Sequence, residues 1–344
     1  MGPRASRRAV LAGGASTALW GCMGVRGQRP GSGEAAAIFE QFDPAFSSVV
    51  NVYGKPRLLG EGYIWAEGPA WHRWRRTLYF TDVPSNTAHS WTDGAGTRIF
   101  LRPSGSQGSV EGFREPGANG LLVSRSGALL LCNHGERALQ SVDIATGQRT
   151  TLASSFMGKR FNSPNDVVEA ADGTLYFTDP PYGLEGLDAS PLKEMDINGV
   201  YRLSPGGQLT RVADFLTFPN GVALTPDGSA LLVSQSDPAA PRVYRLDLDG
   251  RQEPEIWFDA GPFMAGVTGL PDGMAMASDG HLFLAGPGGV LVLDPEANCL
   301  GRIATGRATA NCAFGEDGRT LFITAHDRLL AVRTNIVGLG YQTA

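Results

Sequence analysis

A sequence frame that occurs six times constrains the fold of this chain more than any other feature. Each unit opens with a polar residue, continues as a short apolar strand, turns at a pair such as Asp172-Gly173 or Asp279-Gly280, and returns through a second strand such as LYFTD or LLVSQ. Asp-Gly pairs between β-branched and aromatic residues are typical of hairpin turns. The units begin at residues 67, 119, 165, 220, 272 and 311. This spacing suits one four-stranded propeller blade per unit.

The repeats predict an all-β chain folded as a six-bladed β-propeller with a central channel. Helical periodicity of any length is absent from the sequence after residue 50, which argues against α/β and barrel alternatives. The 46 glycines and 22 prolines are spread through all 344 residues, in agreement with many short strands and turns. We expect the propeller to span residues 58–344, preceded by a lead-in segment at 31–57 that packs on the rim or stays irregular.

Residues 1–30 have the composition of an export signal. The segment MGPRASRRAVLAGGASTALWGC has a basic start and then a run of small and apolar residues, which is too short and too rich in glycine for a membrane span. The pair Arg7-Arg8 resembles a twin-arginine signal, and LWGC, ending at Cys22, resembles a lipoprotein processing box. The sequence therefore predicts an exported protein, either periplasmic or anchored to the membrane as a lipoprotein through Cys22. Cleavage and release without lipid remains an alternative.

The net charge indicates the class of partner, and the cysteines indicate whether disulfides are expected. The formal net charge is −5 and the pI is about 5.6, so no basic field is available to gather nucleic acid, and a small molecule is the expected partner. Beyond Cys22 the chain has Cys132, Cys299 and Cys312, an odd number with wide spacings and no CxxC pattern. We expect buried thiols, with one optional disulfide. A monomer or small homo-oligomer is expected.

Equivalent positions of the repeats converge in space, because the inner strand of every propeller blade starts near the same mouth of the channel. The residues that open the six units all carry a side-chain oxygen, and we call them the ring residues: Glu67, Asn119, Asn165, Asn220, Asp272 and Asn311. Asn and Asp also initiate turns by bonding to their own backbone, which is the structural alternative for any single unit. Six aligned units, one of them opened by Glu, favour a ligand site.

Oxygen ligands with two formal negative charges suit a hard divalent cation. Ca²⁺ is favoured, because its flexible shell accepts carboxylates, amide carbonyls and water. Mg²⁺, Mn²⁺ or Zn²⁺ remain alternatives, although no His and Cys cluster typical of zinc is present in the sequence.

Several motifs together resemble the senescence marker protein/gluconolactonase (regucalcin-like) family, over about residues 58–335, and the likeness is strongest to bacterial sugar lactonases. The motifs are WAEGPAW (65–71), LYFTD (78–82), ANG (118–120), CNHGER (132–137), GKRFNSPNDV (158–167), LYFTDPPYG (175–183), FPNGVA (218–223) and PDGMAM (271–276). As a set they are specific, whereas any one alone is weak.

The resemblance implies a six-bladed propeller that holds a divalent cation at the channel mouth and hydrolyses lactones such as gluconolactone. Carried over motif by motif, it implies a set of metal ligands formed by Glu67, Asn165, Asn220 and Asp272. Asn119 and His134 would face the substrate. Many relatives have Glu directly before that histidine, where this chain has Asn133.

Lactone hydrolysis needs a polarised carbonyl, a nucleophilic water and stabilisation of the oxyanion. Asp272 is the carboxylate that we expect to act as general base or to orient the water, and direct attack by Asp272 is a variant.

The sequence contains no GxSxG elbow and no Walker or GxGxxG loop. Two other functions stay open: a non-catalytic exported binding propeller with a structural ion, and an organophosphate or aryl-ester hydrolase that uses the same site.

Overall fold

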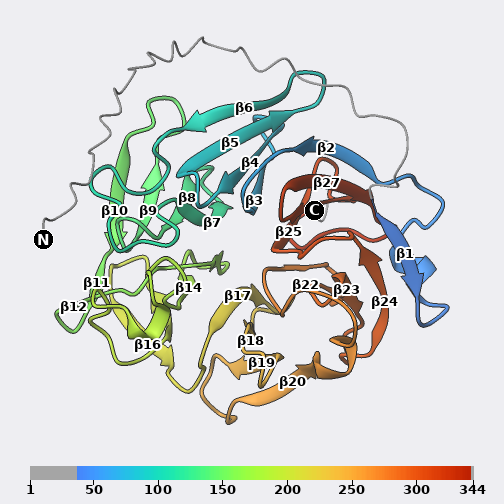
Figure 1. Ribbon diagram of the computed structural model, residues 1–344. Coiled ribbons are helices and arrows are strands. Elements are labelled where there is room, and N and C mark those ends of the chain that lie inside the picture. Colours follow the sequence, from blue (N-terminus) through green and yellow to red (C-terminus); the bar gives the residue numbers. More distant parts are fainter. Residues whose placement is uncertain (1–36, 342–344) are drawn as a thin grey trace, which may run out of the picture. The chain divides into compact units, whose positions relative to one another are not determined.

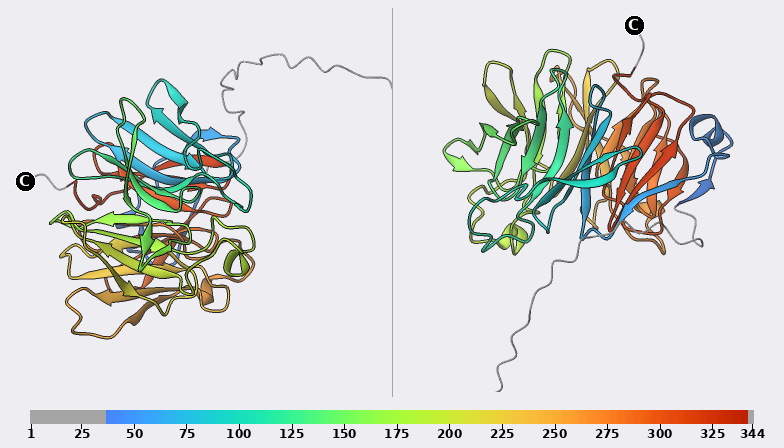
Figure 2. Two further views of the ribbon diagram at one scale, coloured as in Figure 1. Left: turned by 90° about the vertical axis from the view of Figure 1, so that its left-hand side faces the viewer. Right: turned by 90° about the horizontal axis from the view of Figure 1, so that it is seen from above.

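The structure is a computed structural model that describes residues 37–341. The predicted export segment at 1–30, with Arg7, Arg8 and Cys22, lies outside the described residues. Six antiparallel sheets are arranged radially around a central axis, with strands β3, β7, β17 and β25 next to it (Figure 1). Figure 2 shows the same sheets from two other sides, with their strands running between the two faces of the ring. The predicted six-bladed, all-β propeller is confirmed.

Blades one to five take their four main strands consecutively from the chain. Blade one is β3 (Ala66–His72), β4 (Thr77–Asp82), β5 (Thr87–Thr92) and β6 (Gly96–Leu101); blade two is β7 (Ala118–Val123), β8 (Leu129–Asn133), β9 (Ala138–Val142) and β10 (Arg149–Ala153); blade three is β13 (Val167–Glu169), β14 (Leu175–Asp179), β15 (Gly199–Leu203) and β16 (Leu209–Ala213); blade four is β17 (Pro219–Leu224), β18 (Ala230–Gln235), β19 (Arg242–Asp247) and β20 (Glu255–Asp259); blade five is β21 (Met274–Met276), β22 (Leu282–Gly286), β23 (Gly289–Leu293) and β24 (Cys299–Ala304). A small hairpin, β11 (Ser155–Phe156) with β12 (Lys159–Arg160), follows blade two.

Blade six closes the ring by combining the two ends of the propeller sequence. Its inner strands are β25 (Asn311–Gly315), β26 (Thr320–Ala325) and β27 (Arg328–Arg333), and its outer strand is β2 (Arg57–Glu61), which pairs with β27. The lead-in adds β1 (Ile38–Gln41) to the outer edge of blade five through β24, and a short helix, α1 (Phe46–Val49). Closure therefore joins residues more than 250 positions apart in the sequence.

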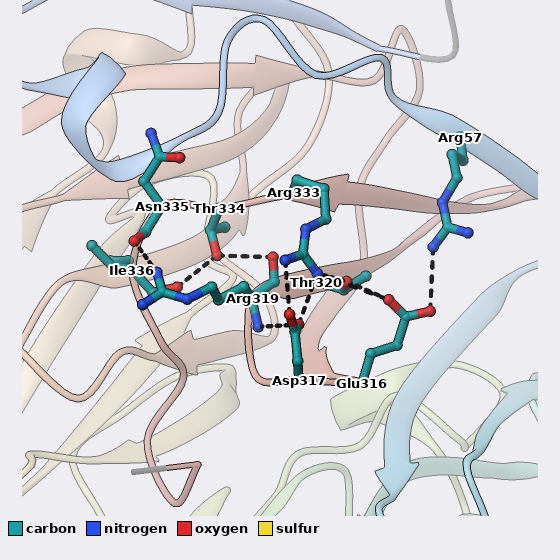
Figure 3. Close-up of polar contacts among 9 residues, drawn as sticks. All are labelled: Arg57, Glu316, Asp317, Arg319, Thr320, Arg333, Thr334, Asn335 and Ile336. Atoms are coloured by element: carbon teal, nitrogen blue, oxygen red, sulfur yellow. Dashed lines mark hydrogen bonds and ion pairs between the residues drawn. The ribbon is translucent and has the colours of Figure 1, made fainter. Parts of the chain in front are cut away.

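Charged side chains lie around this closure, and one pair joins β2 to the rest of blade six (Figure 3). Arg333 of β27 forms two hydrogen bonds to the carboxylate of Asp317, at 2.7 and 2.9 Å, and Arg57 of β2 lies 3.4 Å from Glu316. Arg319 donates to the carbonyl of Asn335 just beyond β27. These groups are partly exposed, so they contribute little free energy compared with the buried contacts between blades.

The core consists of six apolar clusters, one at each interface between neighbouring blades. Successive side chains of a strand point to opposite faces of its sheet, so each strand serves two interfaces. In β4, Leu78 and Phe80 pack against blade six, whereas Tyr79 packs against blade two. This is why the inner strands read as nearly continuous apolar runs rather than as alternating ones.

The predicted turns are present, and two of the three cysteines predicted to be buried are buried. Gly173 and Gly280, in two of the predicted Asp-Gly turns, have φ values of 86° and 95°, in the left-handed region that favours glycine. Cys132 and Cys312 are buried, and the three cysteines of the described chain are free thiols. Over residues 37–341, no helix is long and apolar enough to cross a membrane.

Candidate active site

The ring residues lie where the inner strands begin. Glu67, Asn119 and Asn220 are the second residues of β3, β7 and β17, and Asn165 and Asp272 precede β13 and β21 by two positions. All five line one cavity of about 770 Å³, which we call the mouth cavity. Because each comes from a different blade, the side chains meet only through closure of the ring. The convergence that the repeats predicted is present for these five residues.

Asn311, the sixth ring residue, does not line the mouth cavity, although its side chain lies against that of Glu67. Its side-chain oxygen accepts a hydrogen bond of 2.8 Å from the backbone N–H of Cys312, the local bonding typical of a turn asparagine. It lines a second cavity of about 540 Å³, together with the later residues of the inner strands and Asp166. Since the inner strands run away from the mouth, this cavity lies at the far end of the channel.

Glycine follows four of the ring residues and lets the blades meet closely. A Cβ atom on Gly68 would lie 2.2 Å from the carbonyl oxygen of Asn119, and one on Gly221 would lie 2.3 Å from that of Asp272. No side chain can occupy such a space. The glycine after Glu67, Asn119, Asn220 and Asp272 is therefore a sequence signal of the site.

The repeated FTD motif holds these strands in place. The hydroxyl of Thr178 donates a hydrogen bond of 2.6 Å to the carbonyl of Asn220 in the next blade, and Thr81 bonds Asn119 in the same way at 2.9 Å. Threonine thus connects blade one and blade three to the ring residue of the next blade.

The aspartate of the same motif acts within its own blade. The carboxylate of Asp82 accepts hydrogen bonds from the backbone N–H groups of Ile64 and Trp65, at 3.1 and 3.0 Å. Asp179 accepts two bonds of 2.8 Å from Asn162 and Ser163. Each aspartate therefore fixes the segment that leads into the ring residue of its blade, which explains why FTD recurs.

Two oxygen atoms of the ring residues are buried without a hydrogen-bond donor in the described chain. They are Oδ1 of Asn165 and Oδ1 of Asp272. Other side-chain oxygens of the ring residues do accept hydrogen bonds. Oε2 of Glu67, for example, accepts a bond of 2.9 Å from the N–H of Gly68. An acceptor that is buried without a donor costs free energy, so its retention indicates that a ligand completes it.

The carboxylates of the site repel one another. Burial raises the pKa of Asp272 well above its usual range, and the charges of Glu67 and Asp166 raise it further. Burial likewise raises the pKa of Glu67, and the charge of Asp166 adds to the effect. A cation near Asp272 and Glu67 would relieve this repulsion.

The donor set therefore fits a divalent cation. The described chain has no cluster of three or more His, Cys, Asp and Glu side chains arranged for a metal, and the set here is different: two carboxylates with the amides of neighbouring blades. Such all-oxygen sets are the ones that Ca²⁺ accepts.

His134 is fully buried and is not among the residues that line the mouth cavity. Its Nδ1 lies 3.6 Å from Oε2 of Glu115, which does line the cavity, and its side chain also lies against Asn165. Burial lowers the pKa of His134 to about 3, so the ring is neutral. A substrate contact by His134 stays a prediction, and in this geometry the histidine reaches the cavity through its neighbours.

The mouth cavity is also lined by Arg114, Glu115, Tyr182 and Ser236. Arg114 and Glu115 form an ion pair in the connection between blades one and two. Tyr182 lies in the loop after β14, its ring stacked on Phe218 with centroids 6.0 Å apart, and burial raises its pKa, so the phenol stays a hydrogen-bond donor. The sequence leaves open whether Tyr182, in LYFTDPPYG, roofs the pocket or belongs to an ordinary connector, and it gives no role to Arg114, Glu115 and Ser236.

Fold and site together define a six-bladed propeller with an oxygen-rich ligand site at one mouth of its channel. Residues 65–327 match the family model described as SMP-30/Gluconolactonase/LRE-like region, and the chain belongs to this family. It is 41% identical to a gluconolactonase of Zymomonas mobilis over 316 residues, which cover 89% of each chain. A pentonolactonase of Haloferax volcanii is 27% identical over 265 residues, 75% of this chain and 80% of the relative.

Solved structures agree. A gluconolactonase of Xanthomonas campestris superposes with a TM-score of 0.75 at 30% identity, over 90% of this chain and 99% of that one. A putative gluconolactonase superposes with a TM-score of 0.76 at 32% identity, over 88% and 99%. The protein is thus a lactonase, and its relatives support a role in the hydrolysis of sugar lactones.

Proposed function

We propose that the protein hydrolyses sugar lactones with the help of a divalent cation, most simply Ca²⁺, bound at the mouth of the channel. Glu67, Asn165, Asn220 and Asp272 would hold the cation. The observation that carries the proposal is their convergence on one cavity, with acceptor oxygens of Asn165 and Asp272 buried and without donors.

A bound cation supplies Lewis-acid polarisation of the lactone carbonyl and attracts the oxyanion. The residues of the chain do the rest. Asp272 takes a proton from the attacking water or orients it, as its position on the cavity allows. Asn119 hydrogen-bonds hydroxyl groups of the substrate, and Tyr182, whose hydroxyl donates to the carbonyl of Phe218 at 3.4 Å, lines the same cavity. Glu67 neutralises charge and serves as a ligand.

The test is gluconolactone hydrolysis, followed with a pH indicator after subtraction of spontaneous opening. Activity should disappear when the purified protein is treated with a chelator and return when Ca²⁺ is added. Glu67→Gln and Asp272→Asn should each lower kcat at least 100-fold while the far-ultraviolet spectrum stays that of a β-protein. Calorimetric Ca²⁺ titration should show weakened binding in both variants.

Glu253→Gln and Asp249→Asn are matched controls, because both side chains are exposed in the turn between β19 and β20 and neither lines the mouth cavity. Both should retain activity and Ca²⁺ binding. Full turnover in the chelator-treated protein would refute the metal requirement. Unchanged turnover in both site variants would refute the proposed site.

We also propose export, on the strength of residues 1–30 alone. Replacing Arg7-Arg8 by Lys-Lys should leave the protein in the cytoplasmic fraction if the segment is a twin-arginine signal. Cys22→Ala should move it from the membrane to the soluble exported fraction if Cys22 carries lipid. Unaltered fractionation of either variant would exclude the corresponding step.

A further inference from the structure

The mouth cavity has two chemically different walls. The loops that lead into blades five, six and one contribute Ile64, Trp65, Met264, Val267, Leu270 and Ala308, which we call the apolar wall. Arg114, Glu115, Tyr182 and Ser236, from the region of blades two to four, line the other side. Because the apolar residues precede Glu67, Asp272 and Asn311 in the chain, they lie on the solvent side of the ring residues.

The apolar wall is held by its surroundings. The N–H groups of Ile64 and Trp65 bond Asp82, and the Trp65 ring packs edge-on against His326 with centroids 5.6 Å apart. The segment of the apolar wall that leads into blade five, residues 264–270, is held by the turn between β22 and β23. There the N–H of Gly288 donates a hydrogen bond of 2.7 Å to the carbonyl of Thr268. The wall is thus part of the folded scaffold.

Position 269 brings this segment close to blade five. Gly269 has a φ of 106°, and a Cβ there would lie 2.5 Å from the carbonyl oxygen of Gly286. Glycine is therefore required for the segment to approach β22. The close approach fixes Val267 and Leu270 beside the cavity.

The apolar wall offers few polar groups to a ligand. Thr309 also lines it, but its hydroxyl is paired with that of Thr305 at 2.8 Å within the same loop. Thr268 adds one further hydroxyl. A hexonolactone has hydroxyls on four of its six carbons, and hydroxyls placed against such a wall would lose their water partners. A bare sugar lactone therefore fits the polar side.

The mouth cavity is larger than a sugar lactone requires. Pockets of 300 to 1,000 Å³ bury drug-sized ligands, and the mouth cavity, at about 770 Å³, lies in the upper part of that range. A hexonolactone, with twelve non-hydrogen atoms, is much smaller than such a ligand. An unbranched alkyl chain attached to the lactone ring would cover the remaining apolar surface.

We propose that the site also accepts γ- and δ-lactones that carry an alkyl substituent, with the carbonyl at the ring residues and the chain along the apolar wall. The reaction part of this inference rests on the proposed function. Water adds through its oxygen to the carbonyl carbon, the ring C–O bond breaks, and the proton passes to the departing alkoxide. The product is a hydroxy acid, and no co-reactant besides water is needed.

The test uses δ-valerolactone, δ-octalactone and δ-decalactone, which carry substituents of zero, three and five carbons, with Ca²⁺ present. Removing one methylene from water favours binding by about 0.8 kcal/mol, so kcat/KM should rise about two- to fourfold per carbon. In Met264→Gln/Val267→Thr, which keeps the size of both side chains, the ratio of decalactone to valerolactone should fall at least tenfold. Met157→Gln, at an exposed hairpin tip 86% accessible, should keep the wild-type ratio.

Binding of 6-alkyl-2-piperidones, lactams that are not hydrolysed, provides a readout independent of turnover. Calorimetric affinity should increase with chain length in the wild type and not in the double variant. Gluconolactone turnover with no chain-length effect on lactones and lactams would overturn the inference and leave the proposed function standing. Chain-dependent lactam binding without hydrolysis of any lactone would support the apolar wall and overturn the proposed function.

Discussion

The side-chain amide of Asn165 donates a hydrogen bond of 2.6 Å to the amide oxygen of Asn220 in the next blade. The NH₂ group of Asn220 in turn donates to the hydroxyl of Ser236 at 2.9 Å, and that hydroxyl donates to the carbonyl of Pro271 at 2.5 Å. Pro271 directly precedes Asp272. One chain of hydrogen bonds thus orients three of the four proposed ligands across three blades, and it leaves Oδ1 of Asn165 free.

The first prediction concerns Ser236, which positions Asn220 rather than reacting itself. In Ser236→Ala the NH₂ group of Asn220 loses its acceptor and the amide can rotate, so the dissociation constant for Ca²⁺ should rise about 10- to 100-fold. The free energy of unfolding without Ca²⁺ should change by only about 1 kcal/mol. Calorimetric titration and urea unfolding measure the two quantities. Ser229→Ala, in an exposed turn, is the control, and equal Ca²⁺ affinities in all three proteins would contradict this role.

The second prediction uses the pH dependence of stability at Asp179. Burial raises the pKa of this carboxyl to about 7, although the N–H groups of Asn162 and Ser163 bond to it. The unfolded group ionises near pH 3.9, so between about pH 4 and 7 the folded state binds the extra proton, and this stabilisation is lost as the pH rises through 7. Asp179→Asn should therefore cost about 2 kcal/mol more at pH 5 than at pH 8.

Urea unfolding at the two pH values measures this difference, with Asp249→Asn as the exposed control. A cost for Asp179→Asn that does not change between pH 5 and pH 8 would show that Asp179 is ionised in the folded protein over this whole range.

The third prediction tests the close approach of the inner strands. A Cβ on Gly221 would lie 2.3 Å from the backbone oxygen of Asp272, which cannot move without shifting β21. Gly221→Ala should lower the free energy of unfolding by about 1–3 kcal/mol and weaken Ca²⁺ binding, because Asp272 is displaced. Gly206→Ala has no neighbour nearer than 3.8 Å and should do neither. Wild-type stability in Gly221→Ala would mean that the blades can separate at no cost.

The fourth prediction distinguishes buried from exposed contacts in ring closure. Phe322 of blade six is fully buried, and its ring stacks on Trp71 of blade one with centroids 5.5 Å apart. Phe322→Ala should cost about 3–5 kcal/mol. Arg57→Ala removes only the exposed contact to Glu316 and should cost at most about 1 kcal/mol. Thermal and urea unfolding would contradict this account if the two variants were equally destabilised.

Much of the fold could be predicted because its signals are local. The Asp-Gly turns, the apolar runs and the spacing of the units depend on neighbouring residues, and they defined six blades without reference to distant contacts. The same spacing placed Glu67 and Asp272 at the starts of inner strands. The pairing of β2 with β27 could not be read in this way, because it depends on which chain end reaches the open edge of blade six.

The site was predicted in part for the same reason. Equivalent positions converge, so the repeats brought out Glu67, Asn119, Asn165, Asn220 and Asp272 before any geometry was known. Asn311 occupies an equivalent position, yet its side-chain oxygen accepts a bond from the next backbone N–H and the residue lines the far cavity instead of the mouth cavity. The cavity that such a side chain lines depends on tertiary packing, which a repeat in the sequence does not determine.

By itself, the sequence determined the number of blades, the turns between their strands, and the polar residue that opens each inner strand, since each follows from residues close together in the chain. Only the tertiary structure decided which oxygens meet, which of them lack donors, and that an apolar wall from blades five, six and one faces a polar one. The physical reason is that distances across the axis depend on the closure of the ring and on packing between blades. Both are set by contacts among residues far apart in the sequence.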